Sequence, residues 1–406
     1  MNRIKSSDLK LGMRFSLPVF FDDGINMFLA EKKPITHFHL SAIENWKISY
    51  VITYGNILKD EEVRNTDENL DLKSLNKQNS SIEKVVANNT LQVIAENLSQ
   101  VDKNIRETYS KNLKKVRLFF SCAKNNKNIS RSEIDITIDE IYKLTLQDSM
   151  SIIGYIMSLT PESDLAKNAL NSAIFASSLA IVQGLSKREI LQIIGASLFH
   201  DIGMLSTSEH IMQKKSHLST SEYNLIKLHP LRSARFASET LFFSKEVSLI
   251  IIQHHEYWNG TGYPAGLKEN AIEKGARILA IADSFSAMIS KKTYRDSLIG
   301  YDAIKNLMED TQKQFDPELI QTFVKMMGAY PIGSIVLLNN TLIGQVVSSN
   351  PEMPFMPDIK LLTEPKKNSD STSSTEDEFH IGQIIKLRYR RNLCIIKVLH
   401  PDEYTV

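Results

Sequence analysis

The sequence predicts a mainly α protein, in which a central helical bundle has a small α+β module before it and a small β appendage after it. From residue 161 to 328 nearly every segment has the apolar spacing of a helix, whereas after residue 329 the apolar residues gather in short runs bounded by turn residues. A length of 406 residues suits two or three domains. We therefore expect the module at 1–58, a linker and helical connector at 59–160, the bundle at 161–328 and the appendage at 329–406.

Composition and charge exclude several classes of protein. Apolar residues make up 42% and charged residues 23%, as in ordinary globular proteins. A formal net charge of +1 argues against a broad nucleic-acid footprint, so we expect no DNA partner. No run reaches the ~18–20 apolar residues of a membrane span, and Met1–Lys5 lacks the apolar core of a signal peptide. Cys122 and Cys394 lie far apart, which suits a reducing compartment and predicts a cytoplasmic protein.

The N-terminal part of the chain shows no evident chemistry. Up to about residue 55, short apolar runs alternate with turn signals such as Asp22-Asp23-Gly24, which indicates a small α+β module. Residues 60–80 are polar, as in a linker. Residues 81–160 include stretches that suit helices, so we expect a helical connector or partner-binding segment there; a linker is the alternative. A homodimer formed through this connector is a further hypothesis.

The bundle places candidate metal ligands at the inner ends of separate helices. A capping box at 186–189, with Ser at the N-cap and Glu three residues later, predicts a helix that ends near His200. A second capping box, at 219–222, predicts a helix that ends near His229. A third helix, begun at a serine, has one face formed by Val247, Ile250, Ile251 and His254. Helical bundles build metal sites from side chains arranged in this way.

The appendage is predicted to be a small β structure. Residues 335–338, 343–347 and 384–387 are short apolar runs typical of strands, and the turn signal Asn339-Asn340 joins the first two. Residues 364–378 contain almost no apolar side chain, so we predict a disordered loop there.

The candidate chemistry is concentrated in histidines and aspartates. Six of the ten histidines lie between residues 200 and 255, namely His200, His210, His217, His229, His254 and His255. Asp283 follows an apolar run, where a buried carboxylate is costly unless it is paired or coordinated. A hydrogen-bonded core histidine or a paired aspartate would explain any one of these residues alone. Together they favour a site for divalent Fe, Mn or Zn, with the candidate ligands His200, Asp201, His229, His254, His255 and Asp283.

The arrangement of these ligands indicates phosphoester hydrolysis. Adjacent residues on a helix point about 100° apart, so His200-Asp201 and His254-His255 can each reach two metal ions. Two metal ions a few ångströms apart can share a hydroxide nucleophile and stabilise charge on phosphoryl oxygens. The loop Trp258–Pro264 adds glycines that permit close backbone approach and aromatic rings that could stack on a base. Taken alone, that loop is better explained as a tight surface turn.

These motifs resemble the HD-GYP domain, a subgroup of the HD metal-dependent phosphohydrolases. The resemblance covers roughly residues 161–328 in six blocks, which are His200-Asp201-x-Gly203, His229-Pro230, His254-His255-Glu256, Asn259–Pro264, Asp283 and Tyr294-Arg295. It implies a bacterial phosphodiesterase that hydrolyses cyclic di-GMP to pGpG or GMP through a metal-bound hydroxide, with two or three divalent metal ions, often iron or manganese. The six candidates above would be the metal ligands, with Asp201 as the bridging catalytic carboxylate. Gly262 and Tyr263 would belong to a loop that binds substrate or partners such as GGDEF diguanylate cyclases.

The sequence also departs from the family pattern. Asn168 stands where the family has a histidine ligand, and an amide oxygen is a weaker ligand than imidazole. Asp164, on the same helical face, stands where some members carry a glutamate ligand; a solvated aspartate at the helix start explains it equally well. Met204 replaces a lysine that would contact a phosphate. Lys292 replaces an arginine and loses its bidentate fork, whereas Arg295 fits the remaining basic position and is assigned to phosphate binding; a surface arginine is the alternative.

Three functions follow as hypotheses. We favour a working phosphodiesterase of reduced rate, because the bridging aspartate and the paired histidines are present while one polar transition-state contact can be worth ~2.7–4 kcal/mol. The alternative is a catalytically impaired domain that acts as a cyclic di-GMP receptor or protein-interaction module. A hydrolase of nucleotides such as ppGpp or dNTPs is disfavoured, because the Gly-Tyr-Pro loop is present.

Overall fold

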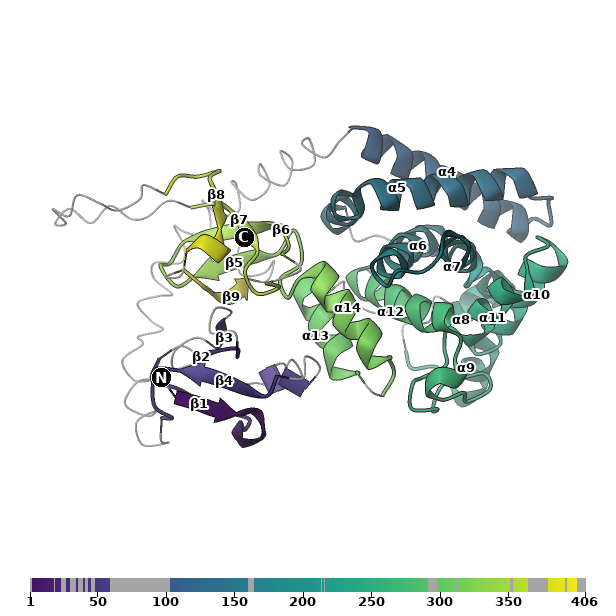
Figure 1. The fold of residues 1–406 in the computed structure, drawn as a ribbon. Coiled ribbons are helices and arrows are strands. Elements are labelled where there is room, and N and C mark those ends of the chain that lie inside the picture. Colours follow the sequence, from purple (N-terminus) through teal and green to yellow (C-terminus); the bar gives the residue numbers. More distant parts are fainter. Residues whose placement is uncertain are drawn as a thin grey trace. The chain divides into compact units, whose positions relative to one another are not determined.

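The computed structural model describes residues 2–58, 103–159 and 164–399, with gaps at 18, 23–26, 30–33, 36–38, 41–42, 45–47, 213, 215, 291–297, 312, 351–352, 364–378 and 391–392 (Figure 1). The chain divides into two compact units. The helical unit comprises residues 99–326, and the sheet unit comprises 1–98 together with 327–406. The predicted linker at 60–80 and the predicted loop at 364–378 lie outside the described residues.

The helical unit is built around α6 (Leu165–Val182), which packs against α4 (Lys103–Lys124), α5 (Arg131–Ser158), α7 (Lys187–Phe199) and α12 (Lys274–Ile289). The alanines and serines of α6 are small enough for helices to approach it from several sides, and almost every residue from Ala166 to Ala180 is buried. Among the described helices, α6 alone is long and apolar enough to cross a membrane, and 83% of that stretch is buried inside the protein. It is therefore a core helix in this structure.

The helical unit contains further helical elements, two of which begin at the predicted serines, Ser219 and Ser244. They are the 3-10 turn η2 (Ile202–Ser206), α8 (Glu209–Met212), α9 (Thr220–Ile226), α10 (His229–Glu239), α11 (Lys245–Gln253), α13 (Gly300–Glu309) and α14 (Pro317–Met327). Both predicted capping boxes form, at the starts of α7 and α9, and Pro230 lies in the first turn of α10. Ser244 is the N-cap residue of α11, but its side chain makes no capping hydrogen bond.

Helices α4 and α5 belong to the helical unit. The sequence predicted a separate helical connector at 59–160, and these two helices do not form one. Apolar residues on α4 that include Val116, Phe119 and Phe120 are buried, and the Phe119 ring stacks on that of Phe199, with ring centroids 6.0 Å apart. The sequence gave no sign that α4 would pack this apolar face against the bundle. Packing of both helices on α6 and α7 extends the bundle beyond its predicted start at residue 161.

The sheet unit contains two antiparallel sheets among its described residues. In the first, β1 (Asn2–Lys5), β4 (Tyr50–Thr53), β2 (Val19–Phe20) and β3 (Met27–Leu29) lie side by side in that order. In the second, the order is β8 (Ile384–Lys386), β7 (Asp358–Leu361), β6 (Ile343–Ser348), β5 (Ile335–Leu338) and β9 (Ile395–Leu399). The predicted strands at 335–338, 343–347 and 384–387 are thus confirmed to within one residue, whereas β7 and β9 were not predicted.

The two ends of the chain share one compact unit, although the sequence analysis treated them as separate domains. The apolar cluster of the first sheet includes Phe21 and Phe28, and Phe355 from the C-terminal region packs against it. The rings of Phe21 and Phe355 lie 5.3 Å apart. Phe355 lies in the connection between β6 and β7, where no periodicity allowed this contact to be predicted.

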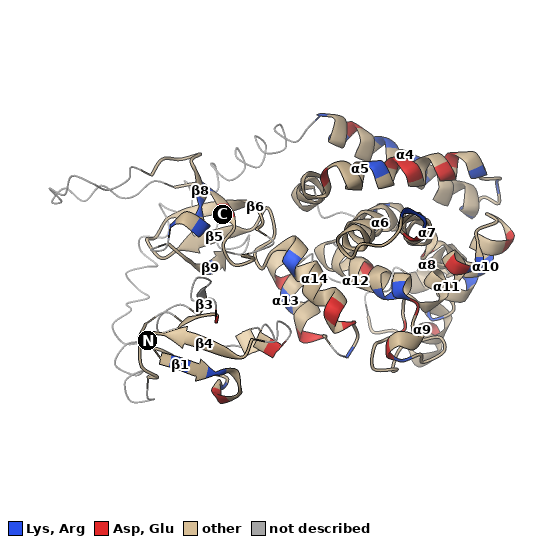
Figure 2. Ribbon diagram, in the orientation of Figure 1, with Lys and Arg blue, Asp and Glu red and all other residues tan. Residues whose placement is uncertain are grey.

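Acidic and basic residues are interspersed along the described helices, and neither sign covers a whole helix (Figure 2). Several of them form ion pairs on the surface of α4 and α5, such as Lys111 with Glu140. This mixture matches the formal net charge of +1.

Candidate metal centre

Six side chains predicted as metal ligands come together inside the helical unit. His200 and His254 are the C-cap residues of α7 and α11, His229 is the first residue of α10, and Asp283 lies within α12. His200 Nε2 lies 3.3 Å from Asp201 Oδ2 and 3.2 Å from Asp283 Oδ1, and His229 Nε2 lies 3.2 Å from Asp201 Oδ1. The fold therefore brings together residues that are up to 83 positions apart in the sequence.

Three of the histidines are oriented by the ends of their own helices. Nδ1 of His200 donates to the carbonyl oxygen of Ser197 at 2.7 Å, and the corresponding contacts of His229 and His254 reach the carbonyls of Ile226 and Ile251 at 2.8 and 2.6 Å. A carbonyl oxygen can only accept, so Nδ1 carries the proton in each ring. Nε2 of each ring is then directed at the centre, as in metal-ligating histidines.

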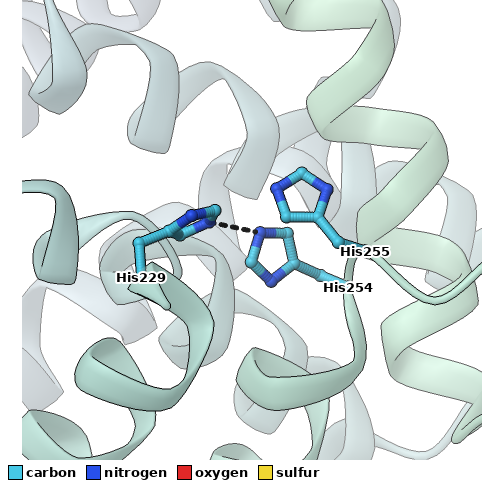
Figure 3. Close-up of side chains that lie close together, drawn as sticks. All are labelled: His229, His254 and His255. Carbon is cyan, nitrogen blue, oxygen red and sulfur yellow. Dashed lines mark hydrogen bonds between the residues drawn. The ribbon is translucent and has the colours of Figure 1, made fainter. Parts of the chain in front are cut away.

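These donors form two overlapping groups. His229, His254 and His255 make one group, His200, Asp201 and His254 make the other, and the ligand atoms within each group lie within 4.8 Å of one another. The Nε2 atoms of His229 and His254 are 3.4 Å apart, and the two rings point at each other (Figure 3). Two lone pairs at this distance repel unless a proton or cation lies between them. The donor set therefore fits divalent metal ions, with His254 common to both groups.

The electrostatics of the centre also favour a cation. Burial lowers the pKa of His254 well below its ordinary range and that of His255 to about 4, and the neighbouring histidines add to both shifts. Burial opposes ionisation of Asp201 and Asp283, but the facing imidazolium of His200 outweighs burial and holds the pKa of both carboxyls well below the usual value. Burial likewise disfavours charge on His200, yet the two carboxylates raise its pKa well above normal. A metal ion would displace the proton from Nε2 of His200, because it would neutralise the same two carboxylates.

Asn168 approaches the centre through its amide nitrogen. Its Nδ2 donates to Asp283 Oδ1 at 2.8 Å, and its Oδ1 accepts from the hydroxyl of Ser286, also at 2.8 Å. A carboxylate only accepts and the side chain of Asn168 is buried, so these two contacts fix the orientation of the amide. In this orientation the atom beside Asp283 cannot ligate a metal ion. Asn168, which the resemblance places at a ligand position, here orients Asp283 instead.

Replacing Asn168 by alanine is expected to weaken metal binding about 10- to 100-fold without changing the number of ions bound at saturation. The reason is that Asp283 loses an orienting donor while every ligand remains. Metal titration with elemental analysis measures both quantities. Asn171→Ala is the matched control, because Asn171 lies one helical turn away and accepts from the hydroxyl of Tyr109 at 2.8 Å. A saturation value lower by one ion per chain would show instead that Asn168 is a ligand.

Gly203 explains why η2 can lie against the start of α10. A Cβ atom on Gly203 would lie 2.5 Å from the carbonyl oxygen of His229 and 2.8 Å from the backbone nitrogen of Ser233. The Gly203 N–H also donates to Ser233 Oγ at 2.8 Å. This close approach sets the position of Asp201 relative to His229, since the two elements cannot separate without losing these contacts.

The loop after the paired histidines folds back on them. A Cβ atom on Gly262 would overlap the backbone nitrogen of Tyr257 and would lie 2.5 Å from the carbonyl oxygen of His255. The Tyr263 N–H donates to that same oxygen at 3.0 Å. The Tyr263 ring then lies on the imidazole of His255, with centroids 4.8 Å apart and planes 30° apart. Gly262 therefore allows the loop to place Tyr263 beside the centre.

Glu256 holds this loop, and the sequence analysis assigned it no role. Its buried carboxylate accepts from the backbone N–H groups of Ala265 at 2.7 Å and Leu267 at 2.9 Å. The sequence feature that could have pointed to Glu256 is its position just before a glycine-rich loop, because the backbone N–H groups of such a loop need acceptors.

Lys227 is a second residue near the centre that the sequence analysis missed. It is the C-cap residue of α9, two positions before His229. Its Nζ lies 4.7 Å from the ring centroid of Tyr223 and 5.4 Å from that of Tyr263. A lysine at the end of a surface helix is common, so the sequence gave no reason to single it out.

The other predicted site residues are placed as follows. Asp164 is the N-cap of α6: it accepts from the Lys167 N–H at 2.8 Å and pairs with the guanidinium of Arg117 at 2.8 Å, with 47% of its side chain exposed. These contacts favour the interpretation of a helix-start aspartate over that of a ligand. Met204 is half-buried on η2. Lys292 and Arg295 lie outside the described residues.

Comparison with known proteins finds a family match over the residues of this site. The HD domain family matches residues 156–319, and a KOW domain associated with the HD domain matches residues 335–406. The cyclic di-GMP phosphodiesterase PdeB of Borreliella burgdorferi is 31% identical over 192 residues, which is 47% of this chain and 50% of that protein. A cyclic di-GMP phosphodiesterase of Pseudomonas aeruginosa is 32% identical over 41% of this chain and 40% of its own length. A 3′3′-cGAMP-specific phosphodiesterase of Vibrio cholerae is 36% identical over 33% of this chain and 31% of its own length.

The chain thus spans half or less of the length of these curated relatives. The matched region contains all six predicted ligands and ends within α14. Residues 156–319, which contain the bundle and its histidine and aspartate donors, match the HD domain family.

Proposed function

We propose that this chain is a metal-dependent phosphodiesterase that hydrolyses cyclic di-GMP. The observation that carries the proposal is the pair of donor groups that share His254, because it provides places for two cations next to each other. The names of relatives from two organisms, both cyclic di-GMP phosphodiesterases, support the same substrate. The absence of a disulfide framework, with Cys122 and Cys394 both free, supports a cytoplasmic location.

In this proposal the metal ligands are His200, Asp201, His229, His254, His255 and Asp283. Two ions bound there would supply Lewis acidity and lower the pKa of a coordinated water. Asp201 belongs to one group and also faces the other, since one of its oxygens lies 3.3 Å from His200 Nε2 and the other 3.2 Å from His229 Nε2. Nitrogen and oxygen donors without sulfur suit iron or manganese. The two donor groups provide places for two ions.

The reaction adds water to one phosphodiester of the cyclic dinucleotide. A new P–O bond forms, the bond from phosphorus to the ribose 3′ oxygen breaks, and that oxygen takes up a proton, which gives linear pGpG. The protein contributes fixed ligand orientations, a site that is largely shielded from water, and the Tyr263 ring beside His255. Orientation and shielding reduce the reorganisation that the reaction would require in water.

Two observations favour alternatives that the same assay separates. The relative from Vibrio cholerae is specific for 3′3′-cGAMP, so one of the two guanines need not be required. Asn168 and Met204 also differ from the family pattern, which suits a receptor that binds the dinucleotide without hydrolysing it.

The test is turnover of cyclic di-GMP and of 3′3′-cGAMP by anaerobically purified protein loaded with Fe or Mn, with Asp201→Ala as the control and metal content measured in parallel. Product that forms only with intact Asp201 supports the phosphodiesterase. Tight binding without product, in protein that holds metal, assigns the chain to the receptor class. Protein that binds no metal after anaerobic loading is incompatible with the enzyme.

A further inference from the structure

We infer that Lys227 is a substrate-binding residue that holds a phosphate of the cyclic dinucleotide beside the metal centre. The inference rests on the proposed function and adds to it a cation that the sequence motifs do not contain. Four observations lead to it.

The first observation is the position of the ammonium group. Tyr263 lies on the ring of the candidate ligand His255, and Lys227 Nζ lies 5.4 Å from the centroid of that same tyrosine. Lys227 also precedes the candidate ligand His229 by two residues, at the end of α9. The ammonium therefore lies against the tyrosine that packs on His255, and it is not part of either donor group.

The second observation is the lack of a counter-ion. Among the residues that the structure describes, no carboxylate lies within ion-pair distance of Lys227, whereas Lys214 of the same region pairs with Glu222 at 2.6 Å. Two aromatic faces attract the half-buried ammonium, but they do not neutralise it. A phosphate of a bound ligand would supply the missing negative charge, because lysine is a common partner for phosphate.

The third observation is the aromatic setting. Tyr223 and Tyr263 both lie against the Lys227 side chain, at 4.7 and 5.4 Å from Nζ to the ring centroids, and Tyr263 is held by its backbone contact with His255. An ammonium restrained in this way loses less rotational freedom when it binds a phosphate, so more of the contact energy becomes affinity.

The fourth observation is the missing lysine at position 204. Met204 follows Gly203, whose missing Cβ would lie 2.5 Å from the carbonyl oxygen of His229. Met204 is thus one residue from a backbone contact with His229, and Lys227 is two residues before His229. Lys227 provides a positive charge near the position at which the resemblance implies a lysine.

A cyclic dinucleotide contains two phosphates, and the metal ions would bind the one that is cleaved. Because the ammonium lies against Tyr263, which packs on His255, and not within a donor group, we assign Lys227 to the second phosphate. A single phosphodiester such as bis(p-nitrophenyl) phosphate has no second phosphate, so its hydrolysis should not depend on Lys227.

The experiment compares wild type, Lys227→Met, Lys227→Arg and the control Lys245→Met in metal-loaded full-length protein. Lys245 is an exposed lysine in the first turn of α11, at the opposite end of that helix from His254. Calorimetry gives the Kd for cyclic di-GMP, steady-state kinetics gives KM and kcat for both substrates, and elemental analysis gives metal content.

For cyclic di-GMP, Lys227→Met is expected to raise Kd and KM about 10- to 100-fold with kcat little changed, while Lys227→Arg keeps most of the affinity. Metal content, the kinetics of bis(p-nitrophenyl) phosphate and all properties of Lys245→Met should match wild type. An unchanged Kd in Lys227→Met overturns the inference, and so does an equal loss on both substrates. Wild type that binds but does not hydrolyse the dinucleotide refutes the proposed catalysis alone, because the Kd comparison still decides the role of Lys227.

Discussion

Replacing His254 by alanine is expected to remove both metal ions and to lower phosphodiester turnover by about 10³-fold or more. His254 is the residue that the two donor groups share, so its loss leaves each group with two ligands. Metal ions contribute several kcal/mol of transition-state stabilisation, and each 1.36 kcal/mol corresponds to a factor of ten in rate. Elemental analysis of the purified variant and single-turnover kinetics with cyclic di-GMP measure the two effects.

His200→Ala is the matched comparison, because His200 belongs to only one group. The group of His229, His254 and His255 remains complete in that variant, so at least one ion per chain should still bind. Equal metal loss in the two variants would mean that the centre assembles only as a whole and that His254 has no special position in it. Circular dichroism of both variants is the control that checks whether they remain helical.

Replacing Gly262 by alanine is expected to lower kcat/KM for cyclic di-GMP about 100-fold or more while metal content stays unchanged. The new Cβ atom would overlap the backbone nitrogen of Tyr257, and backbone atoms cannot move aside as a flexible side chain can. The loop would therefore shift away from His255 and carry Tyr263 with it. A displacement of about 1 Å near reacting groups can cost about 10² in rate.

Gly266→Ala separates this steric effect from backbone strain. Gly266 lies in the same loop and has a φ of +69°, but a Cβ atom there would meet only the carbonyl oxygen of Gly260, at 3.4 Å. The substitution should cost about 1–2 kcal/mol in stability through its positive φ, with a much smaller effect on turnover. If Gly262→Ala were as active as Gly266→Ala, the close approach at Gly262 would not be required for activity.

Much of the candidate centre could be predicted because its signals are local. A capping box is a contact between residues three positions apart, so Ser186 with Glu189 fixed the start of α7. The apolar spacing that follows ends at His200, and the cost of burying the carboxylate of Asp283 pointed to a partner for it. All six predicted ligands accordingly come together in the structure.

The role of Asn168 could not be predicted from its position in the motif. Its amide is oriented by Ser286 and Asp283, which are 118 and 115 residues away in the sequence. Spacing along a helix states which face a residue occupies, but it does not state which atom of an amide meets a neighbour on another helix. The same limit applies to Lys227, since its two aromatic contacts come from α9 and from the loop after α11.

The sequence by itself predicted the six candidate ligands and the helices that carry them, because both depend on periodicity, caps or motifs within short segments. Only the tertiary structure decided that α4 and α5 complete the bundle, that the two ends of the chain form one unit, and which side chains surround the ligands. Those features depend on contacts between residues that are far apart in the chain. Such contacts are selected by the shape and burial of whole surfaces, and no short stretch of sequence contains that information.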